Sequence, residues 1–233
     1  MIVAAAVCPH PPLLFRELSG LEDAAGDLRN ACMAAITSMM SADPGVIVVV
    51  GGADTSGEWS PDERFDLTRF GTTQARPSQR SDLPLSLGVA GTLLDESGWM
   101  GRRELLAVAW QTPTADLAEA ASRLAARPER VGLLVMGEGS ARRGTTAPGF
   151  IDERAPVFDA ALGLALQEGD AVVLRNIDSE LADQLMALGR APFQFLGHAA
   201  PDGAAATVLY EDDPFGVMYF VAVWSWRLGD RLA

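Results

Sequence analysis

The sequence predicts a single α/β domain with a central, mainly parallel sheet flanked by helices. Apolar, β-branched runs alternate along the chain with segments whose apolar residues recur every three or four positions. Stretches rich in glycine, proline and aspartate separate these segments. The chain has 233 residues, of which 48% are hydrophobic, so it can bury one large core. We therefore assign residues 1–233 to one domain.

The expected elements follow one another in the order strand, helix, strand. In the first part of the chain we expect strands at 2–8, 46–50, 85–90, 105–109 and 131–136, and helices at 22–41 and 114–126. In the second part we expect helices at 153–167 and 179–188, with Asp152 and Asp178 as their caps, and closing strands at 208–210 and 217–224. The long polar segment 51–82 is expected to be a functional or mobile loop.

Three loops are expected to meet at one edge of the sheet. They follow Cys8, Val50 and Met136, which end three of the predicted parallel strands. In open α/β sheets, ligands bind outside the carboxyl ends of the strands. The sequence therefore predicts one pocket formed by these loops.

The charge of the chain excludes several classes of function. The net charge is −13, and all 18 basic residues are arginine. A nucleic-acid partner requires clustered positive charge, as does an anionic membrane surface, so neither is expected. The absence of lysine excludes a Schiff-base mechanism. No apolar run approaches the length of a membrane span, and 2–8 is too short for a signal peptide, so we expect a cytoplasmic protein.

The two histidines have different sequence contexts. His10 follows the first predicted strand in "VCPHPPLL", and Cys8 lies two residues before it. His10 is open to two interpretations. It is either a functional residue, which binds a metal or transfers a proton, or a strand-end residue that is hydrogen-bonded to the backbone. Cys8 is expected to be a small core residue. His198 lies in "FLGHAAPDG" and is interpreted as an exposed loop residue, with recruitment to the site of His10 as the alternative.

The glycine-rich loop 136–150 is the most unusual segment. It lacks the Gly-Lys-Ser/Thr end of a phosphate loop and the Gly-x-Ser-x-Gly pattern of a hydrolase elbow. Its arginines, Arg142 and Arg143, carry paired N–H donors that suit a carboxylate or phenolate. An ordinary solvated turn is the competing interpretation.

Carboxylates elsewhere are open to similar alternatives. Glu211, with its two aspartate neighbours, either binds a cation or forms a solvated hairpin turn, and Asp54 has the same two interpretations. Trp224 and Trp226 alternate on the last predicted strand, so one of them is expected to face a core or a subunit interface.

Three stretches, together with the last predicted strand, resemble the class III extradiol ring-cleavage dioxygenase superfamily, in the form of its catalytic subunits. "VCPHPPLL" resembles a strand that ends in an iron-binding histidine, and "VIVVVGGADT" occupies the place of a strand that ends in the second histidine ligand. "MGEGSARRGTTAPGFIDERAPVFDAALGLALQEGD" resembles the block that carries the catalytic histidine, and "PFGVMYFVAVW" resembles the closing strand. The resemblance implies the fold of that family and a non-haem Fe(II) site.

The resemblance also shows where this chain departs from the family. His10 matches the first iron ligand, whereas Ala53 and Ala141 stand at the positions of the second ligand and of the catalytic histidine. Glu211 is the nearest match to the third ligand. A triad of two histidines and one carboxylate holds Fe(II) with open positions for substrate and O₂, and this chain lacks one firm donor.

We therefore expect a divergent family member, a pseudoenzyme without ordinary ring cleavage. It would keep a pocket for a small anionic or aromatic molecule, bound by His10, Glu211, Ser140 and Arg142, of which Ser140 and Arg142 are the candidate catalytic residues. Fe(II) binding is disfavoured, and no other cofactor is expected. One alternative is an active metal-dependent oxidoreductase with rearranged ligands, such as His10, Asp54 and Glu211. Another is a non-catalytic interaction protein that dimerises through the apolar last strand.

Overall fold

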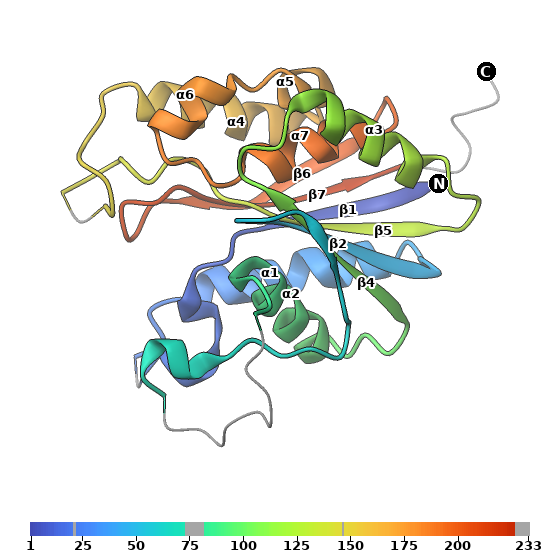
Figure 1. Cartoon of the computed structure of the whole chain (residues 1–233), viewed down its shortest axis with the longest axis horizontal. Coiled ribbons are helices and arrows are strands. Elements are labelled where there is room, and N and C mark those ends of the chain that lie inside the picture. The colour runs from blue at the N-terminus through green and yellow to red at the C-terminus, as the bar shows by residue number, and fades with distance from the viewer. Residues whose placement is uncertain (21, 73–81, 146, 227–233) are drawn as a thin grey trace.

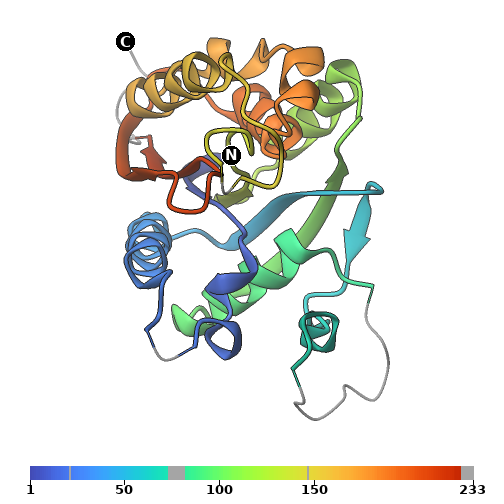
Figure 2. The same cartoon turned by 90° about the vertical axis from the view of Figure 1, so that its left-hand side faces the viewer.

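The chain folds into three layers, with helices on both faces of one sheet. The structure, a computed structural model, describes residues 1–20, 22–72, 82–145 and 147–226. Figures 1 and 2 show the twisted sheet between two groups of helices. The α/β architecture and the flanking helices predicted from the sequence are confirmed.

In the part of the chain that the structure describes, seven strands form the sheet. They are β1 Ile2–Cys8, β2 Val46–Ala53, β3 Gly57–Trp59, β4 Arg102–Ala109, β5 Val131–Met136, β6 Ala205–Asp212 and β7 Tyr219–Ser225. Their order is β3-β4-β2-β5-β1-β7-β6. The four central strands, β4, β2, β5 and β1, run parallel. At one edge β3 runs antiparallel to β4, and at the other β7 runs antiparallel to both of its neighbours, β1 and β6.

Helices cover the two faces unequally. One face is covered by α1 Gly26–Met40 and α2 Leu85–Glu96, and the other by α3 Thr114–Ala125, α4 Ala155–Glu168, α5 Ala171–Arg175, α6 Ser179–Gln184 and α7 Arg190–Ala199 (Figure 1). Within the part of the chain that the structure describes, no helix is long and apolar enough to cross a membrane.

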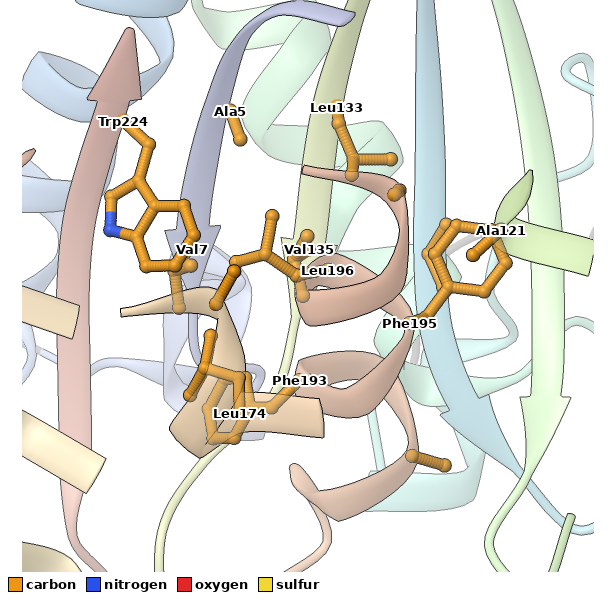
Figure 3. Close-up of a cluster of buried hydrophobic side chains, with 14 of the residues drawn as sticks. Ala5, Val7, Ala121, Leu133, Val135, Leu174, Phe193, Phe195, Leu196 and Trp224 are labelled. Atoms are coloured by element: carbon orange, nitrogen blue, oxygen red, sulfur yellow. The ribbon is translucent and has the colours of Figure 1, made fainter. Parts of the chain in front are cut away.

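The central strands are buried on both faces. Every residue of β1, β2 and β5 is buried, as expected for parallel strands that have helices above and below. Side chains that point to one face of the sheet pack with Phe193, Phe195 and Leu196 of α7 and with Trp224 of β7 (Figure 3). Side chains of the opposite face pack with Leu28, Cys32 and Ile36 of α1 and with α2.

The predicted strand at 85–90 is wrong, because this segment is the first half of α2. Its buried residues include Leu87, Ala90 and Leu94, which have helical spacing, and Gly88 packs closely against Phe65. A window of six residues is too short to show this period. The helix is apolar on most sides, so its pattern resembles that of a buried strand.

Helix α7 occupies a segment for which no helix was predicted. Pro192 is its third residue, where the missing N–H of proline has no acceptor within the helix. Helices therefore tolerate proline in this turn, and the ten residues of α7 continue to Ala199.

Of the two N-cap residues predicted for the later helices, one is confirmed. Asp178 accepts hydrogen bonds from the backbone N–H groups of Glu180 and Leu181, as predicted, although the helix ends at Gln184. The prediction that Asp152 caps α4 is wrong. Asp152 pairs with Arg154, and the helix begins one residue later, at Ala155.

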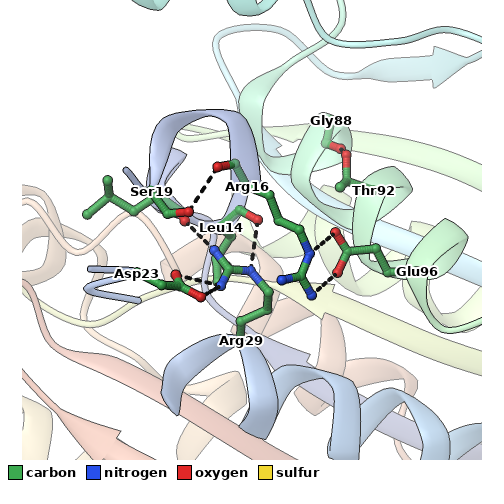
Figure 4. Close-up of polar contacts among 9 residues, drawn as sticks. Leu14, Arg16, Ser19, Asp23, Arg29, Gly88, Thr92 and Glu96 are labelled. Carbon is green, nitrogen blue, oxygen red and sulfur yellow. Dashed lines mark hydrogen bonds and ion pairs between the residues drawn. The ribbon is translucent and has the colours of Figure 1, made fainter. Parts of the chain in front are cut away.

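Arg29 of α1 anchors the segment that follows His10. Its guanidinium is almost fully buried and donates to the carbonyl oxygens of Leu13 (2.8 Å) and Leu14 (3.4 Å). Asp23 supplies the opposite charge, with an N–O distance of 2.6 Å (Figure 4). This buried cation fixes the path of the chain immediately after the first strand.

Candidate functional site

The first and third predicted site loops lie side by side. β5 separates β1 from β2 in the sheet, and all three strands end at the same edge. The Gly137 N–H donates to the Cys8 carbonyl over 3.0 Å, which joins the ends of β5 and β1. The placement of these loops at one edge is thus confirmed.

His10 forms the centre of a cluster at this edge. It is 4% exposed. Its backbone N–H donates to Glu138 Oε2 over 3.3 Å, and its ring Nε2 lies 3.9 Å from Glu138 Oε1. Its other ring nitrogen, Nδ1, is buried and has no hydrogen-bond partner among the described residues. A buried polar atom without a partner is rare in folded proteins and marks a place where a ligand or water can bind.

Trp110 covers the histidine ring. The two rings are stacked with centroids 6.4 Å apart and an angle of 13° between their planes. The indole also lies directly on Gly52 of β2, because a Cβ built there would be only 1.6 Å from Trp110 Cζ3. The backbone N–H of Trp110 donates to the Ala53 carbonyl over 3.0 Å. The glycine at position 52 therefore makes room for the indole beside His10.

Tyr219 is electrostatically coupled to the same carboxylate. It begins β7 and is 4% exposed. Burial raises the pKa of Tyr219, and the nearby charge of Glu138 raises this pKa further. The phenol therefore stays neutral at physiological pH. We call His10, Glu138, Trp110 and Tyr219 the His10 cluster.

Replacing Gly52 by alanine should displace Trp110 from His10. The new methyl group would occupy the position of the indole, so we expect a loss of about 1–3 kcal/mol in the free energy of unfolding. Urea unfolding measures this loss, and NMR of the His10 ring protons detects the loss of stacking. Gly57→Ala is the control, because a Cβ there meets no atom within 4 Å. An unchanged His10 spectrum in Gly52→Ala would contradict the stacked arrangement.

Ser140 is not available to a ligand, contrary to the prediction. It is fully buried, and its hydroxyl donates to Asp159 Oδ2 over 2.5 Å while its backbone N–H donates to Oδ1 over 2.8 Å. Arg143 donates to Asp159 over 3.2 Å and also pairs with Asp213. These four residues, the Ser140 network, hold the glycine-rich loop against α4. Ser140 was assigned a catalytic role, but its contacts are structural.

Arg142 turns back onto its own loop. Its Nη1 donates to the Phe150 carbonyl over 3.3 Å, and its side chain packs against Gly149. Its neighbour Arg143, rather than Arg142, forms ion pairs with carboxylates. The Nε of Arg142 is buried without a hydrogen-bond partner among the described residues, so the predicted role of Arg142 stays a prediction.

The predicted ligand set of His10, Asp54 and Glu211 does not come together. Asp54 is exposed just beyond the end of β2. Glu211 lies on the edge strand β6, and its carboxylate packs toward Gly163 of α4. Within residues 1–20, 22–72, 82–145 and 147–226, no group of three or more His, Cys, Asp or Glu side chains is arranged to hold a metal ion.

His198 is a helical residue, so its interpretation as a loop histidine is wrong. It lies in the last turn of α7 and is partly buried. Burial lowers the pKa of His198, and Arg175 lowers it further. Its Nε2 is buried without a described partner.

Ala53 and Ala141 are both buried and closely packed. Ala53 is 5% exposed and Ala141 is 7% exposed. The backbone N–H of Ala141 donates to the Leu185 carbonyl, and its carbonyl accepts from the Gly149 N–H. Small side chains thus occupy the two positions at which the resemblance would place histidines.

Sequence reasoning missed three members of the His10 cluster. Glu138 follows β5 by two residues, just as His10 follows β1 by two, and this equal spacing at adjacent strand ends was an available signal. Trp110 directly follows β4. For Tyr219, the sequence gives no signal, because its approach to Glu138 depends on the pairing of β7 with β1.

Comparisons with known proteins show a shared fold. No family model and no curated protein matches the chain. A crystal structure of an uncharacterized protein from Escherichia coli K12 is similar, with a TM-score of 0.55 and 16% sequence identity. The similarity covers 96% of this chain and 100% of that one. At this identity the likeness shows the fold alone.

Proposed function

We propose that this chain is a divergent class III extradiol dioxygenase-like protein that binds a small aromatic or anionic molecule at the His10 cluster without ordinary ring cleavage. The observation that carries the proposal is the buried His10 ring, whose Nδ1 has no described partner and which lies beside Trp110 and Glu138. The strand-end position of His10 matches the first ligand position of the family that the sequence resembles.

The residues present do not fit the Fe(II) site of that family. A facial triad requires three protein donors around one ion. Here His10 has one carboxylate neighbour, Glu138, whereas Asp54 and Glu211 lie elsewhere. Among the described residues, this two-member set leaves the ion without a third protein donor, so Fe(II)-dependent ring cleavage is not expected.

The cluster has the groups that a small polar aromatic molecule requires. His10 Nδ1 can exchange a hydrogen bond with a hydroxyl or carboxylate oxygen. The indole of Trp110 offers a flat apolar surface on which a ring can stack. Glu138 lies 3.9 Å from Nε2, so the carboxylate and a ligand at Nδ1 contact different nitrogens of the imidazole.

The test combines catechol binding with metal analysis. Protein purified without chelator or metal-affinity tag is titrated with catechol by calorimetry, and oxygen uptake is followed after addition of Fe(II). We expect catechol binding that weakens about tenfold or more in His10→Ala, no oxygen uptake, and the same substoichiometric iron content in both proteins. Asp54→Ala is the matched control and should bind catechol as the wild type does.

Two results would contradict the proposal in different ways. Stoichiometric iron that disappears in His10→Ala, together with oxygen uptake, would identify an active metalloenzyme with rearranged ligands. Catechol binding that is absent from the wild type, or equal in wild type and His10→Ala, would remove the His10 cluster as the binding site.

A further inference from the structure

A cavity of about 300 Å³ lies between the end of β4 and the start of α7. Its wall includes Trp110, Gln111, Ser179, Asp183, Met186 and Arg190. Among the described residues, Trp110 is the one that this wall shares with the His10 cluster. We call it the Arg190 cavity. Its volume is at the lower end of the range for small-molecule sites, about 300–1,000 Å³.

Arg190 is a buried cation in the wall of this cavity. It is 8% exposed and is the first residue of α7. Its Nη1 donates to the Thr112 carbonyl over 2.8 Å and to Gln194 Oε1 over 3.1 Å, and its Nη2 donates to the Trp110 carbonyl. All three acceptors are neutral, and these bonds leave Nε–H for another acceptor.

The charge of Arg190 is not neutralised within the described part of the protein. Among those residues, no carboxylate lies within 4.0 Å of its guanidinium, whereas Arg29, the other deeply buried arginine, pairs with Asp23 at 2.6 Å. A buried charge without a close counterion is costly. Burial lowers the pKa of Arg190, and the charge of Asp183 opposes this shift to a smaller extent. The helix dipole adds positive potential at the N-terminus of α7, and the first turn of this helix contains no acidic residue that would offset it.

The rim of the cavity limits the charge of its ligand. Asp183 and Glu180 line the opening and are exposed to solvent, where their charges are screened. Arg190 is shielded from solvent, so its charge acts more strongly inside. One buried cation behind two exposed carboxylates matches a ligand with a single negative charge better than a dianion.

We propose that the Arg190 cavity is a second ligand site, which binds a small organic monoanion through a carboxylate on Arg190. This site goes beyond the function proposed above, since neither His10 nor Glu138 lines it. The apolar part of the ligand would lie against the indole of Trp110.

The test compares three ligands of nearly equal shape and different charge. Benzoate, benzamide and benzylamine are titrated into the full-length protein by calorimetry. We expect benzoate to bind about tenfold or more tightly than neutral benzamide, because a charge-assisted bond to a buried guanidinium is among the strong ones. We expect the cation benzylamine to bind more weakly than benzamide.

Three variants locate the site. Arg190→Met should abolish the preference for benzoate, with circular dichroism to verify folding. If this variant does not fold, Ser179→Trp provides the second test, because a bulky ring on this exposed lining residue fills the cavity without changing Arg190. His10→Ala should leave the preference for benzoate over benzamide unchanged, because this preference depends on Arg190, and this result separates the cavity from the His10 cluster.

Each of three contrary outcomes overturns this inference. The first two do not bear on the function proposed above, whereas the third supports it. Equal affinity for benzoate and benzamide would remove Arg190 as a carboxylate anchor. Benzoate binding that persists in folded Arg190→Met or in Ser179→Trp would place the ligand elsewhere. Benzoate binding that His10→Ala abolishes would assign the anion to the His10 cluster instead.

Discussion

Replacing Trp224 by alanine should lower the free energy of unfolding by about 3–5 kcal/mol. The indole is 1% exposed and is among the largest fully buried side chains. Removing it leaves a cavity between β7 and the helices (Figure 3), and the Leu166 carbonyl loses the hydrogen bond that the indole donates over 2.8 Å. Both changes destabilise the folded state and leave the unfolded state unaffected.

Urea unfolding followed by far-ultraviolet circular dichroism measures this loss. The control is Met100→Ala, which removes a side chain that is 95% exposed and should change stability by no more than about 0.5 kcal/mol. A small loss for Trp224→Ala accompanied by a change of oligomeric state would contradict the core role.

This prediction replaces the expected interface role of the last strand. β7 pairs with β1 on one side and with β6 on the other, so it is not an edge of the sheet. Trp224 faces the core, and Trp226 donates from its indole to the Pro201 carbonyl over 2.9 Å. Dimerisation remains a prediction, but the buried Trp224 is not available to a partner.

Replacing Asp159 by alanine should lower the free energy of unfolding by about 3–5 kcal/mol, because it leaves buried polar groups without an acceptor. Ser140 would lose the partner of its hydroxyl and of its backbone N–H, and Arg143 would lose one of two carboxylates. Thermal and urea unfolding give the magnitude. Asp213→Asn is the control. It removes the more exposed carboxylate of Arg143, with an expected loss below about 1 kcal/mol.

The same carboxyl gives a pH dependence of definite sign. Burial raises the pKa of Asp159 above its usual value of 3.8, against the opposing effects of Ser140 and Arg143. The folded state therefore holds this proton to a higher pH than the unfolded state does. The contribution of Asp159 to stability is greatest below pH 3.8 and falls as the pH rises through the raised pKa.

Asp159→Asn isolates this contribution, because asparagine does not titrate. The free energy of unfolding of the wild type minus that of Asp159→Asn should fall with rising pH between 3.8 and the raised pKa. Effects of the other carboxylates cancel in this difference. A difference that increases with pH would show that the ion pair with Arg143 outweighs burial.

The sequence predicted best those elements that are continuous apolar runs with a clear end. The runs that form β1, β2 and β5 are short, and each is followed directly by proline, aspartate or glycine, which favours a buried strand over a helix. α2 and α7 were missed because local rules conflict there. A short apolar helix resembles a strand, and Pro192 is harmless only because it lies in the first turn.

The candidate site divides in the same way. His10 was found because its position depends on one strand and its end. Ser140 was misassigned because its partner, Asp159, is set by how the glycine-rich loop packs on α4. The bond from Arg142 to the Phe150 carbonyl depends in the same way on how this loop packs on itself. No sequence pattern specifies which oxygen a loop arginine or serine will bind.

By itself the sequence determined the α/β class, the strand that ends before His10, and the alanines at positions 53 and 141. These depend on residue type and local period. Only the tertiary structure decided that Glu138 approaches His10 and that Arg190 lies buried without a carboxylate partner among the described residues. The physical reason is that strand order and helix packing bring together residues that lie far apart in the chain. Burial then determines how strongly each charge interacts with its neighbours.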